Sequence, residues 1–152
     1  MMAKHSLGEF VATVRGWKGM VTRDLDAAYR GIVATTAVGG VVTPGRYGPG
    51  TPIRTGFARS SWRFGLGAPV DGPSVPKYEG WVAPPLDLGA LDRMTILDKA
   101  FLTSDCVYMG PLEFGHSQQA PVGMIRTTLM QVQEIANEVT KAGATGSWQP
   151  TS

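Results

Sequence analysis

The chain has 152 residues, of which 43% are hydrophobic and 17% charged, and its net charge is +2. This length predicts a single domain over residues 1–152, and the composition argues against an intrinsically disordered chain. Twenty Gly and eleven Pro predict long loops, whereas no apolar run approaches the roughly 18 residues of a membrane-spanning helix. We therefore expect a globular protein that does not enter a membrane.

The two ends of the sequence carry little pattern. Residues 1–5 lack the continuous apolar core of a secretory signal, so we expect the chain to be made and to fold in a cytoplasm. We expect residues 1–5 and 144–152 to be flexible ends.

The two halves of the chain differ in charge. Residues 1–65 hold nine Lys and Arg against three Asp and Glu, a net charge of +6 that leaves −4 for the remainder. Such a molecule could associate with copies of itself or with complementary partners, since opposed potentials steer association. Ordinary solvated faces are the alternative.

A long helix is predicted over residues 6–38. Ser6 and Glu9 have the spacing of a capping box, and a break is plausible between Gly16 and Gly19. Gly39 and Gly40 are expected to end the helix. Apolar residues recur every three or four positions along it: Leu7, Phe10, Val11, Val14, Trp17, Val21, Leu25, Ala28 and Ile32.

The middle of the chain alternates loops with short elements. The Gly and Pro density of residues 39–54 predicts a loop, which we expect to reach a neighbouring subunit. A strand is expected from about Ala58 to residue 67. Residues 68–86 form a second Pro-rich loop, in which Tyr78 and Trp81 could anchor on the sheet. Residues 87–99 fit either a short helix capped by Asp87 or, at Met94–Leu97, a strand.

The last third is predicted to hold a strand, a turn and a helix. The strand covers residues 100–109, and a further strand is expected to end near Phe114, with Glu113 on the opposite face from its apolar neighbours. Gly115 would permit a turn conformation that other residues resist. Pro121 is expected to open a helix that runs to Ala142 and is ended by Gly143. The apolar stripe of this helix is Met124, Leu129 (or Thr128), Val132, Ile135, Ala136 and Val139.

The order of elements predicts an α+β fold. It comprises a small antiparallel sheet flanked by a long N-terminal helix and a long C-terminal helix, with long Gly/Pro-rich loops.

Little in the sequence points to catalysis. Cys106 is the single cysteine of the sequence, which excludes an intramolecular disulfide and a cysteine-cluster metal site. Its apolar neighbours indicate a buried side chain. His116 and His5 lack the spacing of a catalytic triad or a His-Glu-x-x-His zinc motif. Residues 45–50 lack the Lys-Ser/Thr ending of a phosphate loop. We expect no enzyme activity, no cofactor and no metal.

Two segments resemble a known family. Residues 112–126, LEFGHSQQAPVGMIR, are similar to a signature of siphophage neck and tail-completion proteins, which act between the head connector and the tail tube. Residues 51–62, TPIRTGFARSSW, resemble a second element of the same family. The two segments lie in the family's order. The matching positions expected to shape the fold and its subunit contacts are Thr55, Gly56, Arg59, Trp62, Glu113, Gly115, His116, Ser117, Gln118, Gln119, Ala120 and Pro121.

The resemblance implies a structural virion protein of a long-tailed bacteriophage. It would form a homo-oligomeric ring, six-fold by analogy, at the head–tail junction, after assembly in the host cytoplasm. Its partners would be copies of itself and neighbouring neck, connector, tail-terminator or tail-tube proteins, with possible non-specific contact to DNA in the channel. The same analogy implies the helix–strands–helix order. Closure of a heterologous interface into a ring needs a rotation that is a whole fraction of a turn.

Several residues allow more than one interpretation. Arg59, Trp62 and Arg63 could form a nucleic-acid surface in a binding module based on the basic first half, or a strand with its arginines turned outward. Gln118 and Gln119 could bridge two backbones at a subunit contact, or belong to a solvated turn. Glu113 could pair with an Arg of the basic half, within one chain or between neighbours.

Overall fold

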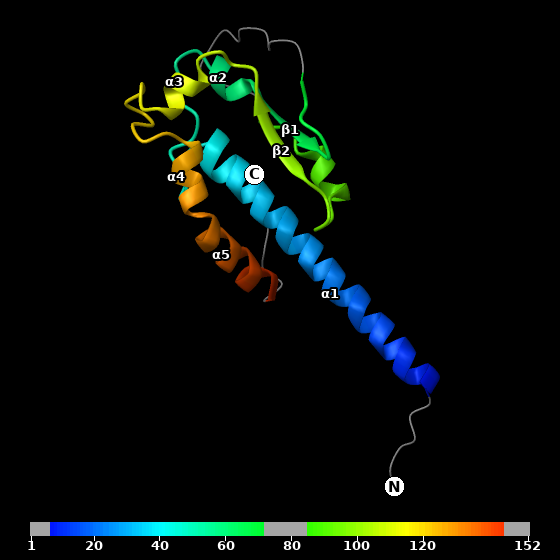
Figure 1. The fold of residues 1–152 in the computed structure, drawn as a ribbon. Coiled ribbons are helices and arrows are strands. Elements are labelled where there is room, and N and C mark those ends of the chain that lie inside the picture. Colours follow the sequence, from blue (N-terminus) through cyan, green and yellow to red (C-terminus); the bar gives the residue numbers. More distant parts are fainter. Residues whose placement is uncertain (1–6, 72–84, 145–152) are drawn as a thin grey trace.

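The computed structural model describes residues 7–71 and 85–144 and confirms the predicted α+β class (Figure 1). A long N-terminal helix packs between a two-stranded antiparallel sheet and the C-terminal helix. The elements, in chain order, are α1 (Leu7–Thr36), η1 (Ala37–Val42), α2 (Phe57–Ser60), β1 (Trp62–Leu66), η2 (Gly89–Arg93), β2 (Ala100–Ser104), α3 (Met109–Glu113), α4 (Ile125–Met130) and α5 (Val132–Ala144).

Helix α1 is continuous over 30 residues, so the break expected between Gly16 and Gly19 does not occur. Each of these glycines lowers helix stability by about 1 kcal/mol relative to Ala, which is too little to interrupt so long a helix. The expected cap residue Ser6 lies outside the described residues. At 1.5 Å per residue the helix is about 45 Å long, and its first half extends away from the rest of the protein (Figure 1).

The expected stop at Gly39 and Gly40 is wrong, because the chain continues as the π-helix η1 to Val42. The N–H of Thr43 closes this wider turn on the carbonyl of Val38 at 2.9 Å. Gly40 is needed there for space, since a Cβ at this position would lie within 3 Å of the Thr128 side chain. Gly40 therefore permits close packing of η1 against α4.

The loop that follows η1 folds back onto it. Gly45 pairs with Gly48 across a tight turn, and the N–H of Thr51 donates to the carbonyl of Val42 at 3.1 Å. Arg46 reaches Glu134 at 2.6 Å and Glu138 at 2.5 Å, both on α5. The predicted loop thus exists over residues 43–54, and contacts within its own chain hold it in place.

The sheet pairs β1 with β2 in the register Trp62↔Ser104 to Leu66↔Ala100. The strand predicted from Ala58 begins four residues later, because residues 57–60 form the short helix α2 after Gly56, whose φ is +80°. Tyr78 and Trp81, expected to anchor on this sheet, lie outside the described residues.

Of the two alternatives for residues 87–99, the short helix is confirmed. It is the 3₁₀ helix η2, whose N-cap position is Leu88 and not the predicted Asp87. The Asp87 carboxylate still accepts a hydrogen bond from the N–H of Gly89 at 2.9 Å. The strand alternative at Met94–Leu97 is wrong. Met94 is fully buried in the core, and Asp98 accepts a hydrogen bond from the N–H of Thr95, which bends the chain into a turn.

The last third departs most from prediction. Strand β2 ends at Ser104 rather than 109, and the strand expected to end near Phe114 is instead helix α3. The predicted helix over 121–142 begins only at Ile125, since Gly123 has a φ of +88°, outside the helical region. It then divides at Gln131 into α4 and α5, and α5 continues to Ala144, past the stop predicted at Gly143.

The core has two buried clusters. The first joins η1 to β1 and α4 through Val41, Val42, Trp62 and Met124. The second joins α1 to η2 through Ala34, Leu91 and Met94, with partly buried residues of the sheet packed against it. In the apolar stripe predicted for the C-terminal helix, Thr128 is fully buried and Leu129 is 56% exposed. Thr128, and not Leu129, therefore faces the core. All of this packing uses the C-terminal third of α1 and η1, leaving the first half of α1 outside the core.

Candidate functional site

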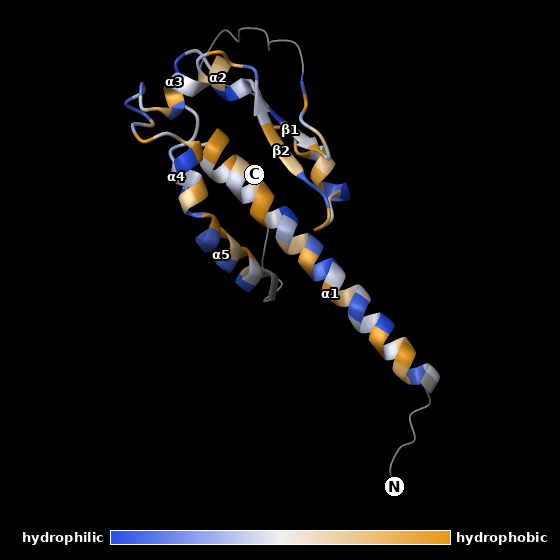
Figure 2. Ribbon diagram, viewed as in Figure 1, coloured by the Kyte–Doolittle hydropathy of each residue, from blue (hydrophilic) through white to orange (hydrophobic). Residues whose placement is uncertain are grey.

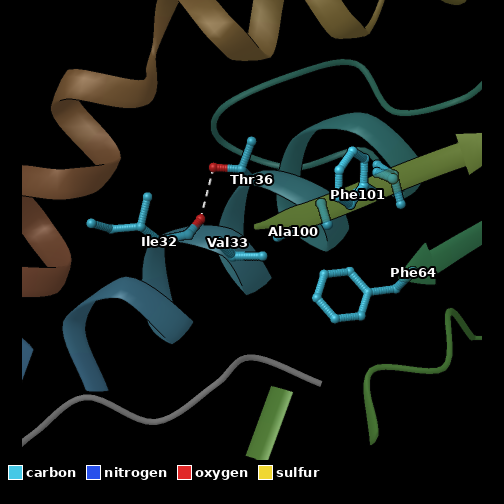
Figure 3. A pocket seen from close by; sticks show the side chains of 8 residues that line it. Ile32, Val33, Thr36, Phe64, Ala100 and Phe101 are labelled. Atoms are coloured by element: carbon cyan, nitrogen blue, oxygen red, sulfur yellow. Dashed lines mark hydrogen bonds between the residues drawn. The ribbon is translucent and has the colours of Figure 1, made fainter. Parts of the chain in front are cut away.

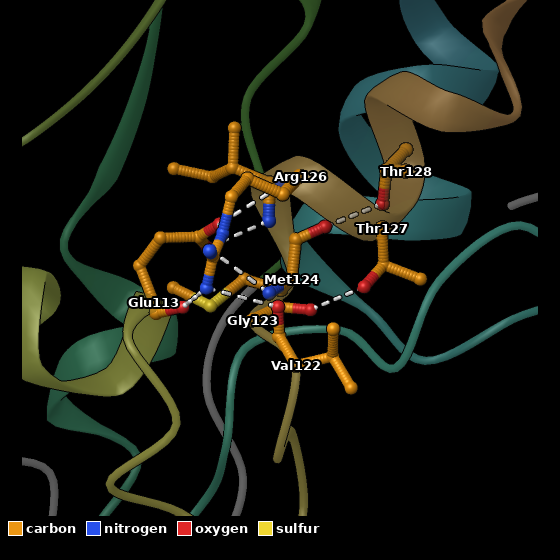
Figure 4. A network of polar contacts seen from close by, with 8 residues as sticks. Glu113, Val122, Gly123, Met124, Arg126, Thr127 and Thr128 are labelled. Atoms are coloured by element: carbon orange, nitrogen blue, oxygen red, sulfur yellow. Dashed lines mark hydrogen bonds and ion pairs between the residues drawn. The ribbon is translucent and has the colours of Figure 1, made fainter.

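Two segments carry the family resemblance, residues 51–62 (the N-terminal motif segment) and residues 112–126 (the C-terminal motif segment). The buried carboxylate of Glu113 organises the C-terminal motif segment (Figure 4). Its Oε2 accepts hydrogen bonds from the N–H groups of Met124 at 3.0 Å and Ile125 at 2.8 Å, and its Oε1 accepts one from Arg126 at 2.9 Å. The first N–H groups of a helix have no partner within it, and they favour negative charge. Glu113 therefore caps α4 from eleven to thirteen residues upstream.

The Arg126 side chain folds back on the same carboxylate (Figure 4). Its Nε lies 3.2 Å from Glu113 Oε1, and its Nη2 donates to the Glu113 carbonyl at 2.7 Å. The guanidinium also lies over the Phe114 ring, 5.1 Å from its centroid. The ion pair expected between Glu113 and an Arg of the basic first half is thus made instead with the C-terminal half of the same chain. It compensates for burial of the carboxylate.

Two glycines shape the turn between α3 and α4. Gly123 has a φ of +88°, and a Cβ there would lie within 3 Å of the Glu113 carboxylate. Gly115 has a φ of +89°, as its predicted turn role requires, and a Cβ there would lie 2.7 Å from the Pro121 carbonyl. Pro121 is exposed in this turn and does not open a helix, which corrects the prediction for it.

The N-terminal motif segment is fastened through Thr51 and Trp62, both buried. The indole N–H of Trp62 donates to the Thr51 hydroxyl at 2.7 Å, and that hydroxyl donates to the Val41 carbonyl at 2.7 Å. Arg59 donates twice to the Thr51 carbonyl, at 3.1 and 2.8 Å. Thr51, rather than the predicted Thr55, is the residue through which this segment is tied to η1. Thr55 is exposed.

The two motif segments meet at Gln119 and Ile53. The Gln119 amide accepts a hydrogen bond from the N–H of Ile53 and donates one to its carbonyl, each at 2.9 Å. Gln119 thus binds both backbone groups of one residue in its own chain and does not bridge two backbones. The expectation of a subunit contact at Gln118 and Gln119 stays a prediction. Gln118 is exposed, and Ser117 accepts a hydrogen bond from the N–H of Gln119 at 3.2 Å.

The arginines that suggested a nucleic-acid surface are engaged inside the fold. Arg59 is half-buried on α2, where burial lowers the pKa of its guanidinium. Arg63 lies 3.0 Å from Asp105, and this contact holds the pKa of the Asp105 carboxyl below its ordinary value. The predicted strand with outward arginines is wrong for Arg59, which points to the Thr51 carbonyl.

His116 lies in the segment that follows α3. It is exposed, and its backbone N–H donates to the Pro111 carbonyl at 3.1 Å. Within residues 7–71 and 85–144, no group of three or more His, Cys, Asp and Glu side chains could hold a metal ion. None of the helices in that part of the chain is long and apolar enough to cross a membrane. Cys106 is buried, as predicted.

A second surface lies on the projecting half of α1, where hydrophobic residues alternate with hydrophilic ones along the helix (Figure 2). Several of its large apolar side chains are exposed. Phe10 is 63% exposed and Trp17 is 62% exposed. These two residues, with Val14 and Leu25, share one face of the helix at spacings of three, four and eight, and we refer to the four as the α1 stripe. The sequence predicted the apolar periodicity but not that its first half is left uncovered.

No protein-family model matches the sequence, and neither the curated proteins nor the solved structures gave a match.

Proposed function

We propose that this chain is a structural virion protein, a neck or tail-completion subunit that assembles into a ring at the head–tail junction of a long-tailed bacteriophage. The observation that carries the proposal is the α1 stripe, an exposed apolar face on a helix that extends away from the core. Large exposed apolar patches on folded proteins are typical of sites for protein partners. The resemblance of the two motif segments supplies the kind of assembly.

The geometry of the motif residues supports a structural role for them. Glu113, Gly115 and Gln119 cap a helix, shape a turn and link two distant segments. Trp62 and Arg59 secure the loop through Thr51. These contacts hold the two motif segments in place. A subunit that binds its neighbours through shaped surfaces needs such fixed segments.

The mechanism is burial of subunit surface. A heterologous contact between copies closes into a ring when each copy is rotated by a whole fraction of a turn. Six-fold symmetry and the neighbouring neck, connector, tail-terminator and tail-tube partners follow from the resemblance alone. The alternative, a nucleic-acid-binding module, loses support because Arg59 and Arg63 are engaged inside the fold.

The experiment is carried out in the virus-producing cell. Mass spectrometry of purified particles should find the chain at a fixed low copy number. Inactivation of its coding sequence should leave filled heads and tails that fail to join, and expression in trans should restore intact particles. Particles that are complete and infectious without the chain would contradict the proposal.

A further inference from the structure

An apolar groove with a volume of about 190 Å³ lies between α1 and the sheet and runs along β2 (Figure 3). Three consecutive residues of β2 line it, 100–102, but only Phe64 of β1 does. None of the described residues that line the groove is charged, and the Thr36 hydroxyl is already bonded to the Ile32 carbonyl at 2.7 Å. The side chains around the groove therefore suit an apolar group.

The hydrogen bonding of the sheet leaves the outer edge of β2 unpaired. The N–H of Gly67 donates to the carbonyl of Lys99 at 2.8 Å, which continues the β1–β2 register by one residue pair. In an antiparallel ladder, residues bonded to one neighbour alternate with residues whose N–H and C=O groups point to the other side. The backbone groups of Ala100 and Leu102 therefore point away from β1. Within residues 7–71 and 85–144, no hydrogen bond reaches these groups.

This edge is also accessible. All five residues of β2 are half-buried, whereas β1 contains the buried Trp62 and Gly65. Helix η2 packs against β1, and no helix in the described part of the chain packs as closely against β2. Backbone N–H and C=O groups need hydrogen-bond partners, so an open sheet edge is a template for a further strand.

The edge and the groove together specify what binds here. An extended peptide that adds to a sheet edge bonds through its main chain, and its alternate side chains enter pockets beside the edge. The groove is smaller than the roughly 300–1,000 Å³ of small-molecule sites, so it suits one or two side chains.

A second copy of this chain fits the groove poorly. In the described residues the only strands are β1 and β2, which are paired with each other. A second copy would therefore bring a whole sheet with α1 packed on it. A groove of about 190 Å³ can take side chains of a single strand, but not those layers.

We propose that β2 binds an extended segment of a different protein as an added strand, which pairs with the backbone of Ala100 and Leu102. The segment places an apolar side chain in the groove and has uncharged apolar residues at alternate positions. The inference goes beyond the proposed function, because it uses a surface other than the α1 stripe and does not depend on a place in a virus particle.

The first test selects binders of the full chain from displayed random peptides about ten residues long, which is enough for one strand. Each selected peptide is then synthesised with one backbone N–H at a time replaced by N-methyl. Only every second N–H of an added strand faces β2, so binding should be lost at alternate positions and change by less than about twofold at the others. Loss at consecutive positions, loss at none, or a library without binders would overturn the proposal.

The second test fills the groove. Thr36→Leu adds apolar volume inside it, whereas Thr35→Leu makes the same change at a half-buried neighbour that does not line it. Fluorescence anisotropy with a selected peptide should show binding weakened roughly tenfold or more by Thr36→Leu, as expected for loss of an anchor pocket. Thr35→Leu should bind like the wild type. Equal binding by the two variants would overturn the proposal.

The third test removes a backbone donor from the edge. Ala100→Pro deletes an N–H that points away from β1, a position at which a strand tolerates proline, and Ala100→Ser keeps that N–H. Circular dichroism checks that both variants are folded. Ala100→Pro should weaken peptide binding more than Ala100→Ser does, and equal binding would contradict pairing at this edge.

The same measurements identify other occupants. Peptide binding that appears only after removal of residues 145–152 would show that the chain covers its own edge. A wild-type dimer that Ala100→Pro converts into a monomer would show that a second copy takes the edge. Either result would overturn the proposal, and neither bears on whether the chain is present in virus particles.

Discussion

Gln119 pairs with the backbone of Ile53 through two hydrogen bonds of 2.9 Å, in the manner of a strand neighbour. The two residues are 66 positions apart, and their contact joins the two segments that carry the family resemblance. One exposed side chain thus fixes the position of the 51–56 stretch relative to the turn that follows α3.

Replacement of Gln119 by Ala should lower the free energy of unfolding by about 1 kcal/mol, because two hydrogen bonds at a solvated site are lost. Ala at the neighbouring exposed Gln118 is the matched control and should change it by less than about 0.5 kcal/mol. Urea denaturation measures both, and hydrogen exchange at the Ile53 amide should quicken only in Gln119→Ala. Unchanged exchange there would contradict the assigned contact.

Loss of the Glu113 carboxylate should be severe. Glu113→Ala leaves the N–H groups of Met124, Ile125 and Arg126 without their acceptor, and a buried donor that loses its partner costs about 1–3 kcal/mol. The half-exposed Arg126 guanidinium can turn to solvent and adds little to this cost. Glu134→Ala breaks an exposed pair with Arg46 and should cost about 0–1 kcal/mol. Thermal unfolding followed by circular dichroism compares the two variants. Equal melting temperatures would show that the Glu113 network contributes little.

The buried hydrogen bond between Trp62 and Thr51 can be tested without a change in volume. Thr51→Val keeps the shape of the side chain but leaves the indole N–H without an acceptor, which should cost about 1–3 kcal/mol. Thr51→Ser retains the hydroxyl and should recover part of that loss. Chemical denaturation followed by tryptophan fluorescence measures both variants. A Thr51→Val protein as stable as the wild type would contradict the geometry.

Two glycine substitutions should change the free energy of unfolding in opposite directions. Gly123→Ala places a Cβ within 3 Å of the Glu113 carboxylate at a φ of +88°, so it should destabilise the fold by at least about 1 kcal/mol. Gly16→Ala adds a methyl group to an open position in α1, and should stabilise the helix by up to about 1 kcal/mol. The helical content from circular dichroism and the midpoint of urea unfolding test both. Destabilisation by Gly16→Ala would indicate that this face of α1 is covered.

The ion pair of Arg63 and Asp105 gives a dependence of stability on pH. The hydrogen bond from Arg63 holds the pKa of Asp105 below its ordinary 3.8. A carboxyl whose folded pKa is lowered stabilises the fold above its unfolded pKa and loses that contribution as the pH falls through the folded pKa. The stability difference between wild type and Asp105→Asn should therefore be constant near neutral pH and shrink below about pH 4. Denaturation curves at pH 7, 5 and 3 measure it, and a difference that grows in acid would contradict the assignment.

The sequence predicted those helices and strands whose apolar residues recur at regular spacing. The stripe of α1 and the strand around Phe64 were predicted because apolar spacing alone specifies them. Helix α3 was missed because alternation over Leu112, Glu113 and Phe114 is too short to distinguish a strand from a helical turn. Pro111 in the first turn was the available helix signal.

The candidate site was less predictable, because its residues act through contacts distant in the sequence. Nothing near Glu113 in the sequence shows that its carboxylate caps a helix starting twelve residues later. The late start of that helix depends on the positive φ of Gly123, which the favourable position of Pro121 concealed. Thr51 was overlooked because its importance arises from burial next to Trp62.

The close approach of Gly40 to Thr128 also bears on how force passes through the molecule. Helix α1 has its exposed tip at one end and this tightly packed joint at the other, with no break between them. A force applied to the N-terminal end of α1 is therefore transmitted along the helix to the contact between Gly40 and Thr128, which has no room for a methyl group. The direction in which α1 projects from the core is therefore set by the contact between η1 and α4.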